Sequence, residues 1–167
     1  MKKILLRADD LGYSEAVNLG IEKSIRQGLI RSLGVMVNMP ATLHGVELIR
    51  DCDIALGVHV NICAEQPLSD PALIPSLVDE KGYFKSSKTY RSTTDDFVVF
   101  DEVIIEIEAQ YHRFLELFGR KPDYFEGHAV ASAQFFKGLE YVANKYQLKY
   151  SGFPVDDKPI RVGDSLV

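Results

Sequence analysis

The chain has 167 residues, of which 46% are hydrophobic and 26% charged. These are the proportions of an ordinary globular protein, and they exclude a disordered or fibrous chain. The formal net charge is −5 and the lysines and arginines are scattered, so no basic patch is available to bind nucleic acid. We expect one domain over residues 1–167 with no nucleic-acid partner.

The N-terminal apolar run is too short for a signal peptide or a membrane span, because Arg7, Asp9 and Asp10 interrupt it. The two cysteines, Cys52 and Cys63, have the spacing of neither a CxxC motif nor a disulfide framework. We therefore expect a cytoplasmic protein with reduced thiols and no membrane partner.

Short apolar runs alternate with amphipathic stretches along the chain. The run 54–62 alternates apolar and other residues, so His59 and Asn61 share one face of a strand. The patterns predict strands over 4–8, 33–37, 54–62, 124–128 and 148–151, and helices between Ser14 and Gly28, around 46–49, over 101–118 and over 134–146.

Residues 64–98 show neither the alternation of a strand nor the apolar stripe of a helix, and they contain three prolines. A loop of this length inside a compact domain is uncommon. It is either a functional insertion, such as a lid over a site, or a floppy one, and the sequence favours neither.

Alternating strands and helices predict right-handed βαβ units, hence an α/β fold with a parallel sheet. Ligands of such folds bind at the carboxyl ends of the strands. This rule selects the positions at which chemistry is expected.

Three predicted strand ends carry residue types that bind metals. Asp9 and Asp10 follow the first strand, His59 lies near the end of the third, and His128 closes the fourth. Alone, an aspartate there is explained by a helix cap and a histidine by packing. Together, two imidazoles and a carboxylate can hold a divalent ion and leave positions open for water and substrate. One aspartate would ligate the metal while the other handles a proton.

Other polar residues have structural interpretations. His44 lies in a short helix and His112 within the long amphipathic one, so neither falls at a strand end. Asn61 either orients substrate or caps its strand, and we favour the cap.

Several stretches of the sequence, beyond the candidate ligands, match the motifs of a known family. They are Ala8 to Ile21, with Asp9-Asp10-Leu11-Gly12-Tyr13-Ser14; Met36 to Ala41; Leu56 to Asn61; Pro75 to Asp79; Gln110 to Gly119 with Pro122; and Gly127-His128. In these the chain resembles the YdjC-like carbohydrate deacetylases, which remove acetyl groups from N-acetylated sugars such as chitooligosaccharides. The resemblance covers about residues 4–150.

The resemblance implies a variant of the (β/α) barrel and a divalent metal ion, Mg or Zn. By motif, its ligands would be Asp10, His59 and His128, and Asp9 would be the catalytic acid-base residue. The implied substrate is a small acetylated amino sugar.

The chain departs from the family pattern in two ways. The family's histidine-rich run is replaced after His128 by Ala129-Val130-Ala131-Ser132, which affects substrate contacts or the surroundings of the ligand. The family's later His-Pro motif, implied to protonate the leaving amine, has no counterpart before Val167. The chain is then a fragment or naturally short, its barrel is incomplete, and slow turnover and self-association into a homo-oligomer are expected.

Two other functions stay open. The same ligand set suits phosphoester hydrolysis or non-haem iron chemistry. Alternatively, the chain is a truncated relative that binds sugar or metal with little or no catalysis.

Overall fold

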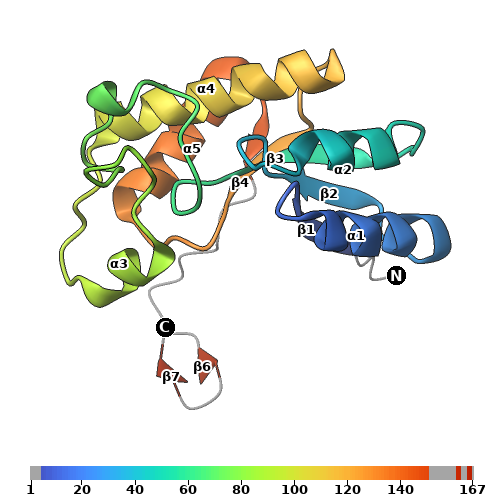
Figure 1. Ribbon diagram of the computed structural model, residues 1–167, viewed down its shortest axis with the longest axis horizontal. Helices are drawn as coiled ribbons and strands as arrows, with labels where there is room; N and C mark the ends of the chain where they lie inside the picture. The colour runs from blue at the N-terminus through green and yellow to red at the C-terminus, as the bar shows by residue number, and fades with distance from the viewer. Residues whose placement is uncertain (1–4, 151–160, 163–164, 167) are drawn as a thin grey trace.

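The computed structural model describes residues 5–150, 161–162 and 165–166. Five parallel strands form one sheet, in which each strand lies beside its predecessor in the sequence (Figure 1). The strands are β1 (Arg7–Leu11), β2 (Ser32–Val35), β3 (Ala55–Val60), β4 (Tyr124–Gly127) and β5 (Lys149–Tyr150). This order is that of a (β/α) barrel and differs from the reversed order of a doubly wound sheet. The predicted parallel α/β fold is confirmed.

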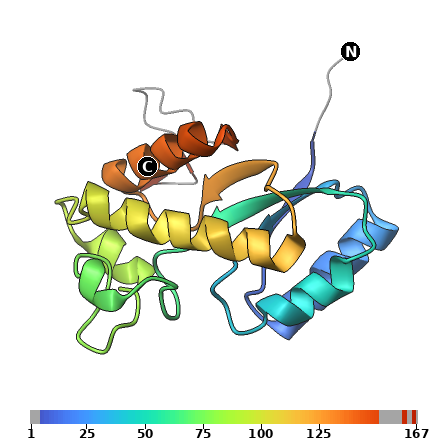
Figure 2. The same cartoon turned by 90° about the horizontal axis from the view of Figure 1, so that it is seen from above.

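The helices that cover the sheet form two pairs, and α2 of one pair contacts α4 of the other, so both pairs lie along the same face (Figure 2). Helices α1 and α2 contact each other and β1, whereas α4 and α5 contact each other and cover β3 and β4. These helices are α1 (Glu15–Gln27), α2 (Thr42–Ile49), α4 (Phe100–Phe118) and α5 (Ala133–Tyr146). All four correspond to predicted helices.

The two faces of the sheet differ in character because side chains alternate along each strand. Phe125 of β4 lies on the helical face, where its ring contacts Tyr111 of α4 edge-on at 6.0 Å between centroids. Its neighbours Tyr124 and Glu126 therefore point to the opposite face. That face, the interior of the barrel-like curve, carries the polar and charged side chains.

Local signals fix the ends of the helices. Ser14 caps α1 by accepting a hydrogen bond from the Val17 amide at 3.2 Å, and Ser132 caps α5 in the same way. Helix α4 ends at Gly119, whose φ of 64° lies in the left-handed region that glycine adopts without strain.

The segment between β3 and α4 is packed onto the domain. It contains the 3-10 helix η1 (Pro71–Leu73) and the helix α3 (Ser87–Ser92). The hydroxyl of Tyr90 donates to the carbonyl of Ile62 at 2.9 Å. Seven of its apolar side chains are buried in the main core: Ile62, Cys63, Ile74, Leu77, Phe84, Tyr90 and Val98. A lid function, one of the two alternatives for this insertion, stays a hypothesis.

The first strand differs from its prediction. It begins at Arg7 and continues through Asp9 and Asp10 to Leu11, whereas the apolar run predicted an end at Ala8. Polar residues fit inside this strand because Arg7 and Asp9 pair with each other on the interior face. Residue 4 and Ser151, which the predictions included, lie outside the described residues.

Beyond the main sheet, β6 (Arg161–Val162) and β7 (Ser165–Leu166) form a separate antiparallel pair that was not predicted.

Among the residues that the structure describes, no helix is both long enough and apolar enough to cross a membrane.

Candidate metal centre

The end of β1 separates two adjacent carboxylates. The pairing register between β1 and β2 shifts between Ala8 and Leu11, and Asp10 has a φ of 69°. Aspartate tolerates this left-handed conformation better than most residues. The amide of Tyr13 then closes a turn by donating to the Asp10 carbonyl at 3.0 Å. The bulge turns Asp10 towards the carboxyl ends of β3 and β4.

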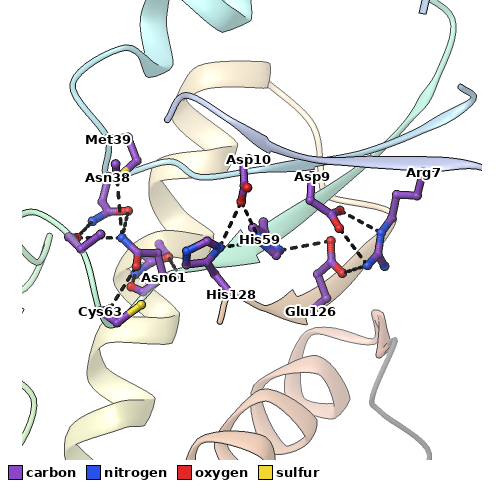
Figure 3. Close-up of polar contacts among 12 residues, drawn as sticks. Arg7, Asp9, Asp10, Asn38, Met39, His59, Asn61, Cys63, Glu126 and His128 are labelled. Carbon is purple, nitrogen blue, oxygen red and sulfur yellow. Dashed lines mark hydrogen bonds and ion pairs between the residues drawn. The ribbon is translucent and has the colours of Figure 1, made fainter. Parts of the chain in front are cut away.

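Three side chains from three strand ends meet beside this turn (Figure 3). The Oδ1 atom of Asp10 lies 3.1 Å from Nε2 of His59 and 3.0 Å from Nδ1 of His128. The two imidazole nitrogens are themselves 2.9 Å apart, and the rings are nearly perpendicular at 82°. Each of these three atoms therefore faces the other two.

This triangle has the composition and the spacing of a metal site. Ligand atoms that each lie about 2 Å from one ion are necessarily close to one another, as these three atoms are at 2.9 to 3.1 Å. Asp10 Oδ1 is buried and makes no hydrogen bond of good geometry with the described residues, which is rare for a carboxylate oxygen. Two imidazoles and a carboxylate suit zinc and related divalent ions. The residues present fit a divalent metal.

The charges of the cluster are strongly coupled. The close imidazoles of His128 and His59, whose nitrogens lie 3.0 and 3.1 Å from Asp10 Oδ1, hold the pKa of Asp10 well below its usual range. Burial disfavours a charge on His59, but the carboxylates of Asp10 and Glu126 outweigh it and raise its pKa to about 9. The structure therefore favours a positive charge between these carboxylates, which either a proton or a metal ion supplies.

A second polar group lies on the other side of the His59 ring (Figure 3). His59 Nδ1 is 3.3 Å from Oε1 of Glu126, a residue of β4 that pairs with His59 in the register of the two strands. Arg7 forms ion pairs with Oε2 of Glu126 and with Asp9, whose Oδ1 lies 2.8 Å from Nε of Arg7. Burial raises the pKa of Glu126.

The structure brings the predicted residues together in two groups. Asp10, His59 and His128 form one group within metal-ligand spacing, and Asp9 and His59 form the other together with Glu126, which was not predicted. Asp9 thus faces Arg7 and Glu126, and Asp10 faces His128. Their assignment as ligands and acid-base residue stays a prediction.

The remaining predicted residues lie elsewhere. His44 is 3.2 Å from the side chain of buried Asn18, and His112 is 3.5 Å from the hydroxyl of Tyr146. The side chain of Asn61 donates to Asn38 and to the carbonyl of Ala64, at 3.1 and 2.8 Å. These contacts agree with the structural interpretations of His44, His112 and Asn61.

Sequence reasoning missed Arg7 and Glu126. Two signals could have identified them: Arg7 is a charge inside an otherwise apolar run, and Glu126 shares its strand face with the predicted ligand His128. Neither signal predicts which residue is the partner. Glu126 lies beside His59 because of the pairing register of β3 and β4, which the local sequence does not determine.

Comparisons with known proteins give the family. A family model described as YdjC-like protein matches residues 3–165. A carbohydrate deacetylase of Thermoanaerobacter pseudethanolicus is 33% identical over 98% of this chain and 66% of that protein. A chitooligosaccharide deacetylase of Citrobacter koseri is 32% identical over 75% of this chain and 48% of that protein. The chain spans between about half and two thirds of such curated relatives.

Solved structures agree with this result. A crystal structure of an Enterococcus faecalis protein named for cellobiose-phosphate cleavage has a TM-score of 0.78 and 30% identity, over 87% of this chain and 57% of that one. A CE4 family pseudoenzyme of Bacillus anthracis, with a TM-score of 0.53 and 9% identity over 89% of this chain and 42% of that one, is alike in fold alone. The match of the family model over nearly the whole chain shows that this protein belongs to the YdjC-like family.

Proposed function

We propose that this chain carries the metal centre of a carbohydrate deacetylase, a hydrolase that removes acetyl groups from N-acetylated sugars or oligosaccharides. One observation carries the proposal: an Asp10 oxygen and one nitrogen each of His59 and His128 converge at 2.9 to 3.1 Å. The names of the curated relatives support the reaction and the substrate class.

In this proposal Asp10, His59 and His128 hold a divalent ion, Mg²⁺ or Zn²⁺. A bound ion supplies Lewis acidity for the amide carbonyl and for the attacking water. The two imidazoles favour Zn²⁺ over Mg²⁺, which prefers oxygen ligands. The half-exposed Asp10 leaves this side of the cluster open to a sugar.

Asp9 is the proposed acid-base residue. Its carboxylate accepts contacts from Nε and a terminal nitrogen of Arg7, at 2.8 and 3.2 Å, which fix its orientation. As base it would take a proton from the attacking water and as acid return it to the leaving amine. Because Asp9 lies on the Glu126 side of the His59 ring, this role requires its carboxylate to reach the water from that side.

Metal content tests the proposed ligands, and the chain contains its own controls. His59→Ala and His128→Ala should each lose stoichiometric Zn²⁺ after dialysis, measured by elemental analysis. His44→Ala and His112→Ala, which remove histidines outside the cluster, should retain it. Stoichiometric metal in either His59→Ala or His128→Ala would contradict the assignment.

Product analysis tests the reaction. The 167-residue chain loaded with Zn²⁺ or Mg²⁺ should release acetate from an N-acetylated chitooligosaccharide, and Asp9→Asn should lower this rate with metal retained. Sugar binding without acetate release would favour a binding protein with little or no catalysis.

A second candidate is a metal-dependent phosphoesterase. The observation behind it is the E. faecalis structural relative, whose name refers to cleavage of a phosphorylated disaccharide. Release of inorganic phosphate from a disaccharide phosphate, without acetate release from the acetylated sugar, would favour this candidate.

Two further expectations stay predictions. Self-association is checked by the solution mass at micromolar concentration, and a monomeric mass would contradict it. A cytoplasmic location is checked by fractionation of cells that express the native gene.

A further inference from the structure

The ring of His59 lies between two carboxylates, and its two nitrogens face different groups. Nε2 faces Asp10 and His128, while Nδ1 faces Oε1 of Glu126 at 3.3 Å (Figure 3). A histidine that binds a metal through one nitrogen needs its proton on the other. The group that faces Nδ1 therefore decides whether Nε2 presents a lone pair to the metal.

Glu126 provides the carboxylate oxygen in contact with Nδ1, at 3.3 Å. Both side chains are at least 93% buried, and neither His59 Nδ1 nor Glu126 Oε1 has a partner of full hydrogen-bond geometry among the described residues, so each atom is free to pair with the other at 3.3 Å. Water is largely excluded from such a pair, so an unpaired Nδ1 proton would be costly. The two atoms are each other's best partners.

The backbone and Arg7 hold Glu126 in place. The parallel register sets Glu126 directly beside His59, so both side chains project from neighbouring strands into the interior. The other oxygen, Oε2, forms an ion pair with Arg7, whose guanidinium also pairs with Asp9 and lies 5.8 Å above the ring of Tyr124. A carboxylate that is held at one oxygen by a fixed guanidinium has little freedom to rotate away from His59.

We infer that Glu126 is a positioning residue for the metal centre: it accepts the Nδ1 proton of His59 and so turns the Nε2 lone pair towards Asp10 and His128, while Arg7 anchors its second oxygen. This inference rests on the proposed metal centre and goes beyond it, because Glu126 lies outside the proposed ligand set of Asp10, His59 and His128. Groups that orient a metal-binding imidazole are commonly worth about 10 to 100-fold in metal affinity.

Zn²⁺ affinity tests the inference without any turnover. In Glu126→Gln, the amide nitrogen replaces one oxygen, so the side chain cannot accept from both His59 and Arg7. Competition with a chromogenic chelator should show a Zn²⁺ dissociation constant raised by about 10 to 100-fold relative to the unmutated chain. Glu126→Asp keeps the charge and should recover part of the loss.

Asp123→Asn is the matched control. Asp123 precedes the same strand and accepts a hydrogen bond from the Leu56 amide at 2.8 Å, remote from the His59 ring nitrogens. This substitution should weaken the fold but leave the Zn²⁺ dissociation constant unchanged. Urea unfolding of each variant separates loss of fold from loss of affinity.

A spectroscopic readout adds a feature that a purely structural role would not change. In the Zn²⁺-loaded chain with ¹⁵N-labelled histidine, the Nδ1 proton of His59 should give a slowly exchanging downfield resonance. This resonance should move or vanish in Glu126→Gln and persist in Asp123→Asn.

The possible outcomes are distinct. If the unmutated chain binds no Zn²⁺, the proposed metal centre fails and this inference fails with it. If the unmutated chain binds Zn²⁺ and Glu126→Gln binds it equally well, with the proton resonance unchanged, the metal centre stands and the role of Glu126 is refuted.

Discussion

Glu106 of helix α4 provides the sharpest stability prediction. Its side chain is fully buried and accepts four hydrogen bonds. Two come from the backbone amides of Leu68 and Ser69, at 3.2 and 3.0 Å. The others come from the Ser69 hydroxyl at 2.6 Å and the side-chain amide of Gln110 at 2.9 Å. It thereby ties the start of the long insertion to the helix. Glu106→Ala would leave these donors without an acceptor.

The magnitude follows from those contacts. Each buried donor left without an acceptor costs about 1–3 kcal/mol, so loss of the network should cost about 3–5 kcal/mol in all, which is large against the roughly 5–15 kcal/mol of a whole domain. With a typical urea m value of about 2 kcal/mol/M, the unfolding midpoint should fall by roughly 2 M. Hydrogen exchange should also accelerate at the amides of Leu68 and Ser69.

Glu116→Ala is the control for this prediction, because Glu116 lies on the same helix and its side chain is 64% exposed in a surface pair with Arg113. Its effect should stay within about 0.5 kcal/mol. If Glu106→Ala unfolds at the same urea concentration as Glu116→Ala, with the Leu68 and Ser69 amides still protected, the network does not hold the insertion.

Two further predictions concern the interior face. A Cβ at Gly34 would lie 2.6 Å from Glu126 Oε1 and 2.9 Å from Asp9 Oδ1, so Gly34→Ala should lower the free energy of unfolding in urea by about 1–3 kcal/mol. The control Gly20→Ala has open space around the new Cβ and should not destabilise the protein. Equal stabilities of the two variants would contradict this prediction. The pKa of His59 rises from 6.5 to about 9 on folding, so its contribution to the stability of metal-free protein is complete below pH 6.5 and is lost as the pH rises through about 9. Urea unfolding between pH 6.5 and 9.5 should show a fall on the order of 3 kcal/mol that His59→Asn lacks, and parallel curves would refute it.

The sequence predicted much of the fold because its signals are local. Helix α4 shows this: its apolar stripe, its acidic first turn and Gly119 determine where it lies, and the structure agrees to within a residue. The candidate ligands were also accessible, since the carboxyl ends of parallel strands lie on one edge of the sheet. A strand end carrying Asp10 and two carrying histidines therefore had to be neighbours.

The parts that sequence reasoning missed depend on pairing between strands. The apolar run suggested that β1 ends before Asp9, because polar residues inside a strand are unfavourable unless partners compensate for them. Those partners, Glu126 for Arg7 and Arg7 for Asp9, come from register and curvature rather than from local pattern. That Asp9 and Asp10 both lie beside the His59 ring, on its two sides, likewise depends on the bulge at the end of β1, because adjacent residues of a regular strand point to opposite faces.

The interior face explains why one histidine connects both polar groups. His59 lies on the central strand, between β2, which carries Gly34, and β4, which carries Glu126. Gly34 has no side chain, so Asp9 and Glu126 can approach the ring from one side while Asp10 and His128 approach it from the other. A bulkier residue at Gly34 would force the carboxylates apart, and a shifted register would move Glu126 to the helical face. The geometry of the candidate metal centre is therefore set by strand pairing as much as by its three ligands.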